Sequence, residues 1–338
     1  MPLIEVENLK KEYKINVKKE GLLGAVINVF NPKYEIKEAV KGVNFSIEKG
    51  EMVGYIGANG AGKSTTIKML TGILTPSSGK VTVDGLIPYK SRIKNNMKIG
   101  AVFGQRTQMW WDLPVIESFK LIQKIYEIPD KKYKENLDFY TEFLDLEELL
   151  RIPVRQLSLG QKMRCEIASA FIHDPQIVYL DEPTIGLDFM VKEKIREFIK
   201  AINKEKDITI ILTTHDLQDI EEICSRIIII DKGLIIYDGA LEDIRNKFCE
   251  HSVVNFQMKT VEHQLENILE ENADKFEVLS KDAHLLDIKF NRNKITVAGV
   301  IQLISPYCNI ADLSIHEASI DTIVKDIYKK QAVTGANN

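Results

Sequence analysis

Gly57-Ala58-Asn59-Gly60-Ala61-Gly62-Lys63-Ser64-Thr65 follows the phosphate-loop pattern of a glycine, four residues and then Gly-Lys-Ser/Thr. Glycines let backbone N–H groups turn inward around an anion, Lys63 supplies a positive charge for the β- and γ-phosphates, and the Ser64 hydroxyl can ligate Mg²⁺. Residues 51–56 read as a short buried strand and residues 63–71 as a helix. This strand, loop and helix predict a site for a nucleoside triphosphate.

A second stretch, Ile177-Val178-Tyr179-Leu180-Asp181-Glu182-Pro183, is an apolar strand that ends in two carboxylates. Functional sites of α/β proteins form at the carboxyl edge of the sheet, where Asp181 would hold Mg²⁺ through water. Glu182 would point toward the γ-phosphate and accept a proton from the attacking water. An acidic pair at a strand end is also compatible with a plain turn and a helix N-cap.

Length and composition bound the class of protein. The 338 residues predict about two domains, each large enough to bury a core. The longest apolar runs, such as residues 227–230, are far shorter than the roughly 18 residues that cross a bilayer, and the start has no secretion signal, so we expect a cytosolic location. The four cysteines lie far apart, which predicts reduced thiols. The net charge of -4 gives no general attraction to nucleic acid, and we expect no such partner.

The first domain is expected over residues 1–245 and combines strands, helices and one insertion. Residues 15–38, between strands at residues 2–6 and 39–47, read as the insertion. Its apolar residues at helical spacing and its flanking lysines suit an interfacial or docking helix, and equally a helix packed on its own domain. A helical subdomain is expected at about 106–172, with helices at 115–128 and 131–150. Strands at 177–180, 208–213, 227–230 and 234–237 alternate with helices at 191–203 and 217–225, which predicts a mainly parallel sheet.

A second, smaller α+β domain is expected over residues 246–332. Its predicted order is strand 252–258, helix 261–271, strands 276–279 and 285–290, helix 297–304, strand 312–316 and a last helix 320–330. The order βαββαβ is the ferredoxin-like arrangement. No chemical motif is found in this domain, and its histidines lack metal-ligand spacing.

The segment Leu157-Ser158-Leu159-Gly160-Gln161, followed by a helix, lies a short distance before the acidic strand. Together with that strand and the phosphate loop, it resembles the signature of the ATP-binding cassette (ABC) ATPases, and the likeness spans roughly residues 3–241. It implies an α/β fold: a P-loop ABC ATPase domain with a mixed core sheet, an antiparallel β subdomain and a helical subdomain, here with the smaller C-terminal domain appended.

The resemblance implies a role for each matching residue. It implies Glu182 as catalytic base, His215 as the switch histidine at the γ-phosphate, and Gln105 as the residue that reaches Mg²⁺ and the attacking water. Ser64, Gln105 and Asp181 would surround the metal. The residues expected to bind ATP are Tyr13 on the adenine, Gly57, Asn59, Gly60, Ala61, Gly62, Lys63, Ser64 and Thr65 in the phosphate loop, Ser158, Gly160 and Gln161 in the signature, and Asp188 in the D-loop.

The family also implies a mechanism with two cassettes. Two copies of the chain, or one copy and a closely related ABC ATPase, close head to tail with ATP between the phosphate loop of one and the signature of the other, and hydrolysis reopens them. Leu159 stands where glycine is usual, which puts rate and affinity in doubt rather than the role. Ser158 and Gly160, which contact the partner's γ-phosphate in the family, are intact.

Cassettes of this kind also occur in chromosome-maintenance and translation proteins, so the function has alternatives. Chromosome-type ATPases insert a long coiled coil after the phosphate loop, and translation-type members usually carry two cassettes, neither of which is found here. Trp110 and Trp111 follow Gln105 where transporters face the membrane subunit, and they suit interface anchors. The same rings are equally compatible with packing inside the helical subdomain.

The sequence therefore favours the ATP-binding subunit of an ABC transporter, at the cytoplasmic face of the membrane, with separate integral membrane permease subunits. The single cassette, the insertion after Tyr13, the Trp-Trp segment and the appended domain look most like ATPases of type-two exporters. The alternatives are the ATPase of an importer with a regulatory ligand-binding C-terminal domain, and a non-transport ABC ATPase.

Overall fold

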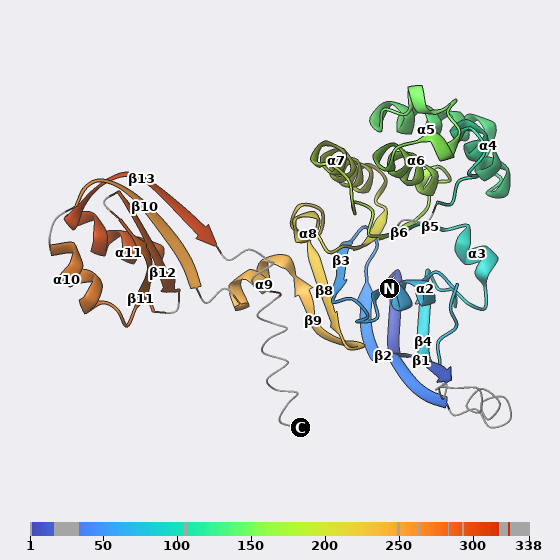
Figure 1. Cartoon of the computed structure of the whole chain (residues 1–338). Coiled ribbons are helices and arrows are strands. Elements are labelled where there is room, and N and C mark those ends of the chain that lie inside the picture. The colour runs from blue at the N-terminus through green and yellow to red at the C-terminus, as the bar shows by residue number, and fades with distance from the viewer. Residues whose placement is uncertain are drawn as a thin grey trace, which may run out of the picture. The chain divides into compact units, whose positions relative to one another are not determined.

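The computed structural model of the chain describes residues 2–16, 34–104, 107–248, 251–261, 264–282, 284–292, 294–317 and 324 (Figure 1). It contains two compact units, Met1–Gly239 and Ala240–Asn338. The division after Gly239 lies earlier than the predicted boundary at residue 245, because helix α9 (Leu241–Phe248) groups with the second unit.

A six-stranded sheet forms the centre of the first unit. Its strands are β5 (Ile99–Phe103), β6 (Ile177–Asp181), β7 (Thr209–Thr213), β3 (Met52–Gly57), β8 (Arg226–Asp231) and β9 (Leu234–Ala240), in that order. The first five are parallel to one another. Only Lys232 and Gly233, both with positive φ, separate β8 from β9, which gives a tight hairpin and makes the sheet mixed. The apolar runs that predict buried strands are the interior of this sheet.

A three-stranded antiparallel sheet, in the order β2-β1-β4, forms a second layer of this unit. Its strands are β1 (Ile4–Asn16), β2 (Tyr34–Ile47) and β4 (Ser78–Val83). Strands β1 and β2 pair out to Asn16 and Tyr34, so both ends of the predicted insertion 15–38 are strand. The helix expected within it lies outside the described residues. The two sheets and helix α2 (Lys63–Leu70) share one core, which includes Phe45, Tyr55, Ile67 and Ile230.

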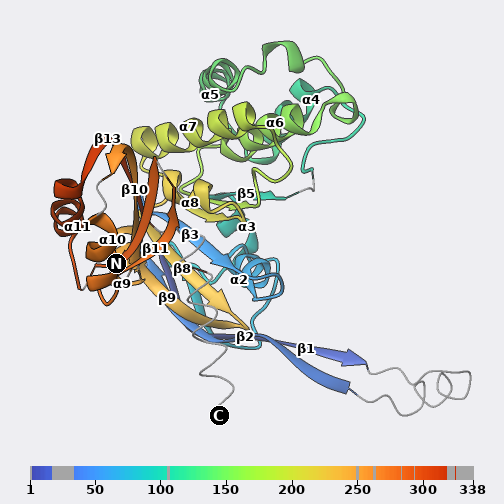
Figure 2. The same cartoon turned by 60° about the vertical axis from the view of Figure 1, so that its left-hand side comes forward.

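The helical subdomain is built from α4 (Val115–Ile125), α5 (Asp130–Phe143), the short 3₁₀ turns η1 (Glu147–Leu149) and η2 (Val154–Gln156), and α6 (Leu159–Phe171). Figures 1 and 2 show α4, α5 and α6 together at one end of the unit and the three-stranded sheet at the opposite end. The second helix was predicted to run to residue 150, which is wrong: it ends at Phe143, and Leu144, Leu146 and Leu149 are buried beyond it.

The remaining helices of this unit are α3 (Arg92–Asn96), α7 (Phe189–Lys206) and α8 (Leu217–Ile223). Helix α7 packs on the helical subdomain through Phe198, whose ring meets those of Tyr140, Phe143 and Phe171 edge-on at centroid distances of 5.7, 5.4 and 5.2 Å. This aromatic cluster joins α7 to α5 and α6, so the segments that precede these helices are held in place by a common core.

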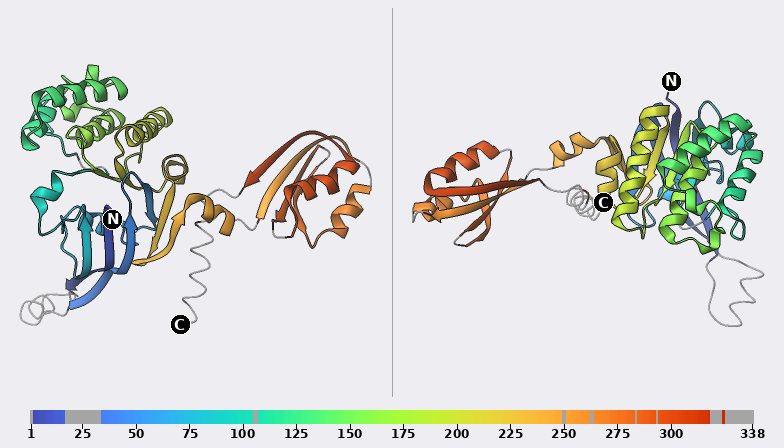
Figure 3. Two further views of the ribbon diagram at one scale, coloured as in Figure 1. Left: turned by 180° about the vertical axis from the view of Figure 1, so that it is seen from behind. Right: turned by 90° about the horizontal axis from the view of Figure 1, so that it is seen from above.

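After α9, the described part of the second unit is a four-stranded antiparallel sheet with two helices. Its elements are β10 (His251–Val261), α10 (Gln264–Glu271), β11 (Phe276–Lys281), β12 (Leu285–Asn291), α11 (Val297–Ile304), the turn η3 (Ser305–Tyr307) and β13 (Cys308–Glu317). The strand order β11-β12-β10-β13 places the first strand centrally, which is the ferredoxin-like arrangement. Figure 3 shows this sheet together with its helices, in orange to red. Both helices bury apolar side chains against one face of the sheet, Leu265 and Val300 among them. The predicted last helix, 320–330, lies outside the described residues except Val324.

No helix among the described residues is both long and apolar enough to span a bilayer. The described cysteines Cys165, Cys224 and Cys308 are buried free thiols. Within the same described ranges, no cluster of histidine, cysteine, aspartate and glutamate side chains has the makings of a metal site.

Candidate functional site

The phosphate loop joins β3 to α2 and is shaped by its glycines. Gly62, the N-cap of α2, has φ 117°, and a Cβ there would lie 2.7 Å from the Ala39 carbonyl oxygen. At Gly60, with φ 80°, a Cβ would meet nothing within 4 Å. The loop is therefore packed against β2 at one glycine and open at the other, as a cradle for an anion at a helix N-terminus must be.

Lys63 crosses the loop rather than extending into solvent. Its residue is only 7% exposed, and Nζ donates hydrogen bonds to the carbonyl oxygens of Gly57 at 2.6 Å and Ala58 at 3.4 Å. Burial lowers the pKa of Lys63, and the negative charges of Glu182 and Asp181 act in the opposite direction. The ammonium is thus held in place beside two carboxylates, where an anionic ligand would meet it.

Asp181 ends β6 and lies beside the start of α2. Ser64 Oγ donates to Asp181 Oδ2 at 3.2 Å, and the Thr213 hydroxyl, from the end of β7, donates to Oδ1. A serine hydroxyl next to a carboxylate is a donor set that suits Mg²⁺. Thr213 was not predicted as a site residue. Its position at the end of the strand next to β6 is the signal that could have identified it.

Glu182 and His215 face each other next to this pair. His215 N donates to Glu182 Oε2 at 3.2 Å, and His215 Nε2 lies 3.2 Å from Oε1. Oε1 accepts no hydrogen bond from the described residues and is shielded from water. Burial raises the pKa of Glu182, and the charges of His215 and Lys63 oppose the rise. A partly buried carboxylate with a raised pKa, held next to an imidazole, has the properties of a general base.

Glu182 is also held in an uncommon backbone conformation. Its φ is +58°, in the left-handed region that non-glycine residues seldom adopt, and its N–H donates to the Thr213 carbonyl at 2.9 Å. Such strain persists only where surrounding contacts hold it, and it is common at functional sites. The chain reverses here, between β6 and α7, so the side chain faces the loop that carries His215.

These groups surround a cavity of about 270 Å³ at the carboxyl edge of the central sheet. Gly57 and Ala61 form the loop without lining the cavity, and Ala61 is 3% exposed. Ala39 and Ala58 line it and were not predicted. The predicted residues that line it are Asn59, Gly60, Gly62, Lys63, Ser64, Thr65, Asp181, Glu182 and His215.

The other predicted residues that the structure describes do not line this cavity. Tyr13, on β1, is 38% exposed, with Lys11 Nζ 5.5 Å from its ring centroid. Gln105 lies outside the described residues. Ser158 caps α6 in a capping box with Gln161, and Asp188 caps α7 through Val191 N at 3.0 Å. Gly160 and Gly186 allow these two helix starts to approach closely. A Cβ on Gly160 would lie 3.3 Å from the Val191 side chain, and one on Gly186 would lie 3.1 Å from the Leu159 side chain.

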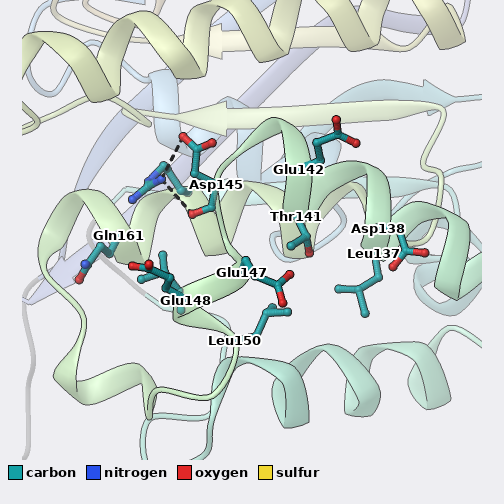
Figure 4. A pocket seen from close by; sticks show the side chains of 11 residues that line it. Leu137, Asp138, Thr141, Glu142, Asp145, Glu147, Glu148, Leu150 and Gln161 are labelled. Atoms are coloured by element: carbon teal, nitrogen blue, oxygen red, sulfur yellow. Dashed lines mark hydrogen bonds and ion pairs between the residues drawn. The ribbon is translucent and has the colours of Figure 1, made fainter.

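A second cavity, of about 660 Å³, lies within the helical subdomain between α5, η1 and the start of α6 (Figure 4). Five carboxylates line it, from Asp138, Glu142, Asp145, Glu147 and Glu148, and Arg164 is the basic residue among its lining. Arg164 is itself engaged with the carbonyl oxygens of Leu144 and Asp145. So much negative charge would repel a triphosphate, whereas the smaller cavity at the phosphate loop is lined by Lys63 and by glycines of the loop.

Trp110 and Trp111 are 39% and 51% exposed, so neither ring is a core residue of the helical subdomain. Lys162 of α6 lies 4.7 Å from the centroid of Trp111, and the Trp111 carbonyl accepts a hydrogen bond from Arg155 N at 2.9 Å. Trp111 thus contacts α6 through Lys162, and both tryptophan rings still leave aromatic surface exposed.

Comparison with known proteins gives the same family and fold as the sequence. The family model described as "ABC transporter" matches residues 40–185. The chain is 34% identical to the ABC transporter ATP-binding protein NatA of Bacillus subtilis over 64% of this chain and 87% of that protein. It is 29% identical to the linearmycin resistance ATP-binding protein LnrL of B. subtilis (86% and 93%) and 33% identical to the methionine import ATP-binding protein MetN 2 of Enterococcus faecalis (73% and 68%).

The solved structures that match include a dimeric ATP-binding cassette in a post-hydrolysis state, bound to ADP and Pi. It superposes with a TM-score of 0.59 at 28% identity over 70% of this chain and 98% of that one. The relatives therefore span proteins named for import and for drug resistance, while the cassette is common to all of them.

Proposed function

We propose, because this chain belongs to the family of ABC transporter ATP-binding proteins, that it hydrolyses ATP in the cavity at its phosphate loop and drives an exporter. The observation that carries the site assignment is the meeting of Lys63, Ser64, Asp181, Glu182 and His215 around one cavity. These residues follow the ends of three strands, β3, β6 and β7, which are far apart in the sequence and adjacent in the central sheet.

In this proposal the loop amides and Lys63 bind the β- and γ-phosphates. The carboxylate of Glu182 takes the proton of the attacking water, while His215, whose Nε2 lies 3.2 Å from Glu182 Oε1, holds Glu182 and contacts the γ-phosphate. The Ser64 hydroxyl and Asp181, with Gln105, would hold Mg²⁺, which when bound neutralises charge on the phosphates. Thr213 keeps Asp181 oriented toward Ser64.

Ser158, Gly160 and Asp188 complete the site of a second copy in this proposal. None of the three lines the chain's own cavity. Ser158 and Asp188 lie at the N-termini of α6 and α7, where backbone N–H groups favour a phosphate. Leu159 (43%), Phe189 (61%) and Met190 (74%) are exposed beside them. An apolar rim of this kind suits burial against another subunit.

The transporter role rests on the family, and the exporter direction on the organisation of the chain. A single cassette, the aromatic segment at Trp110 and Trp111 and the appended ferredoxin-like unit support an ATPase that works with separate permease subunits at the cytoplasmic face of the membrane. An importer with a regulatory C-terminal unit is the second candidate, which the likeness to a methionine import protein favours.

Two experiments test the proposal. Purified chain with MgATP should release phosphate, and a Glu182→Gln variant should retain ATP binding while losing turnover; wild-type turnover in the variant would refute the assignment of Glu182. Co-purification of the tagged chain from membranes should bring down hydrophobic permease subunits. Partners that include a substrate-binding protein outside the membrane would overturn the exporter direction in favour of import.

A further inference from the structure

Asp219 is a buried carboxylate that the proposed chemistry does not use. It is hydrogen-bonded to the two chain segments that carry Glu182 and His215. Asp219, on α8, is 0% exposed, and its partner Arg196, on α7, is 2% exposed. Arg196 Nε donates to Asp219 Oδ1 at 2.7 Å, and Nη2 lies 2.6 Å from the same oxygen. A buried ion pair adds little net stability, because desolvation of both charges offsets their attraction. What else Asp219 contacts therefore matters more than the pair itself.

The second oxygen of Asp219 accepts hydrogen bonds from two threonines on different segments. Thr184 Oγ1 donates to Oδ2, and Thr214 Oγ1 donates to the same atom at 3.1 Å. Thr184 comes two residues after Glu182, and Thr214 comes directly before His215. Both threonines are 2% exposed. One oxygen atom thus joins the two chain segments that carry the candidate base and the candidate switch histidine.

The residue on the other side of His215 is fixed to the same group of contacts. Asp216 N donates to Thr214 Oγ1 at 3.0 Å, and Lys192 Nζ donates to Asp216 Oδ2 at 2.6 Å. Lys192 and Arg196 both belong to α7, the helix that Asp188 caps. His215 therefore lies between two residues that are anchored to α7, directly or through Asp219.

We propose that Asp219 is a positioning residue, which sets Glu182 and His215 at their working separation, and that Arg196 fixes the orientation of its carboxylate. This inference rests on the catalytic roles proposed for Glu182 and His215. Neither threonine can shift without breaking its bond to the shared oxygen, so the two segments move as one. A misplacement of about 1 Å in an active site can lower the rate by about 10²-fold.

The test is steady-state ATP hydrolysis by the purified full chain carrying Asp219→Asn. The asparagine keeps the size of the side chain but removes the negative charge that faces Arg196. It also replaces one of the two acceptor oxygens of Asp219 with an NH₂ group, which cannot accept the hydrogen bonds of that oxygen. We expect kcat to fall by about 10²-fold, with the KM for ATP and the affinity for a fluorescent ATP analogue changed less than about twofold. A fall in kcat at constant KM indicates the loss of an interaction made in the transition state. Activity is normalised to the amount of bound analogue, so that a loss of folded protein does not produce the same result.

Two further variants keep the test decisive if Asp219→Asn does not fold. Thr184→Val removes one hydroxyl at constant shape and should lower kcat about tenfold, with KM again unchanged. Glu222→Gln is the matched control: Glu222 contacts Arg196 Nη1 at 3.0 Å but touches neither threonine, so this variant should keep wild-type kcat. Wild-type kcat in Thr184→Val, or an equal loss in Glu222→Gln, would overturn the inference.

A double variant separates this inference from the proposed function. If Asp219 acts through Glu182, then adding Asp219→Asn to Glu182→Gln should lower kcat little further, because residues that act as a unit are not additive. Independent, multiplying losses would contradict a positioning role even while Glu182 remains the base. Wild-type turnover in Glu182→Gln alone would instead defeat the proposed function.

Discussion

Replacing Lys63 with alanine should weaken ATP binding by an amount that the structure bounds. Lys63 is nearly buried, it lies across the loop, and its ammonium is held by the carbonyl oxygens of Gly57 and Ala58. A charge-assisted hydrogen bond of this kind contributes about 1.5–3 kcal/mol, which corresponds to a 10- to 150-fold weaker Kd. Loss of the donor also leaves two loop carbonyls without it, so the loop itself should become less ordered.

Titration with a fluorescent ATP analogue measures this change directly. Lys80→Ala is a suitable control, because Lys80 lies on β4 in an exposed ion pair with Glu7 and is absent from the cavity lining. The control should bind the analogue with wild-type affinity. An unchanged affinity in Lys63→Ala, or an equal loss in Lys80→Ala, would refute the assignment of the cavity as the triphosphate site.

Three further predictions follow from individual contacts. Burial raises the pKa of Glu182, so hydrolysis, which needs the ionised carboxylate, should be present at high pH and lost as pH falls through a value above the ordinary glutamate range; a pH–rate profile with its acid limb at an ordinary carboxylate pKa would contradict this. The change Trp110→Ala with Trp111→Ala should leave analogue binding intact but release the chain from membranes, which membrane fractionation checks. Phe198→Ala removes the ring that joins α7 to the helical subdomain and should cost about 3–5 kcal/mol in denaturant unfolding; a loss below 1 kcal/mol would mean that the aromatic cluster does not hold α7.

Much of this site could be predicted because its residues lie within short contiguous motifs. In both motifs an apolar strand leads directly into the functional residues: β3 into the loop from Gly57 to Thr65, and β6 into Asp181 and Glu182. The parallel sheet then brings their ends together without further information. The same reasoning explains why the predicted order of strands and helices from residue 252 to residue 316 agrees with the structure, where apolar alternation at residues 285–290 is clear.

Other features could not be predicted, because they depend on contacts between distant residues. Strands β4 and β5 were not predicted, because glycines weaken their apolar pattern. Gly79 lies near the start of β4, and Gly100 lies within β5. Both must be glycine because a Cβ would clash with the backbone of a distant residue, Asn8 or Ala170, which the local sequence does not reveal. The helix predicted to residue 150 ends early because Asp145, with φ 51°, turns the chain. The pairing of Arg196 with Asp219 has no local signature at all.

The central claim is that two copies of this chain enclose ATP and that Glu182 is the base that ends this state. The measurement that tests it most directly is the size of the Glu182→Gln variant by size-exclusion chromatography, with and without saturating MgATP, beside its rate of phosphate release. We predict a dimer that appears only with ATP and hydrolysis slowed about 10²- to 10⁴-fold, the contribution of a general base. A variant that stays monomeric with ATP, or that turns over at the wild-type rate, would contradict the claim.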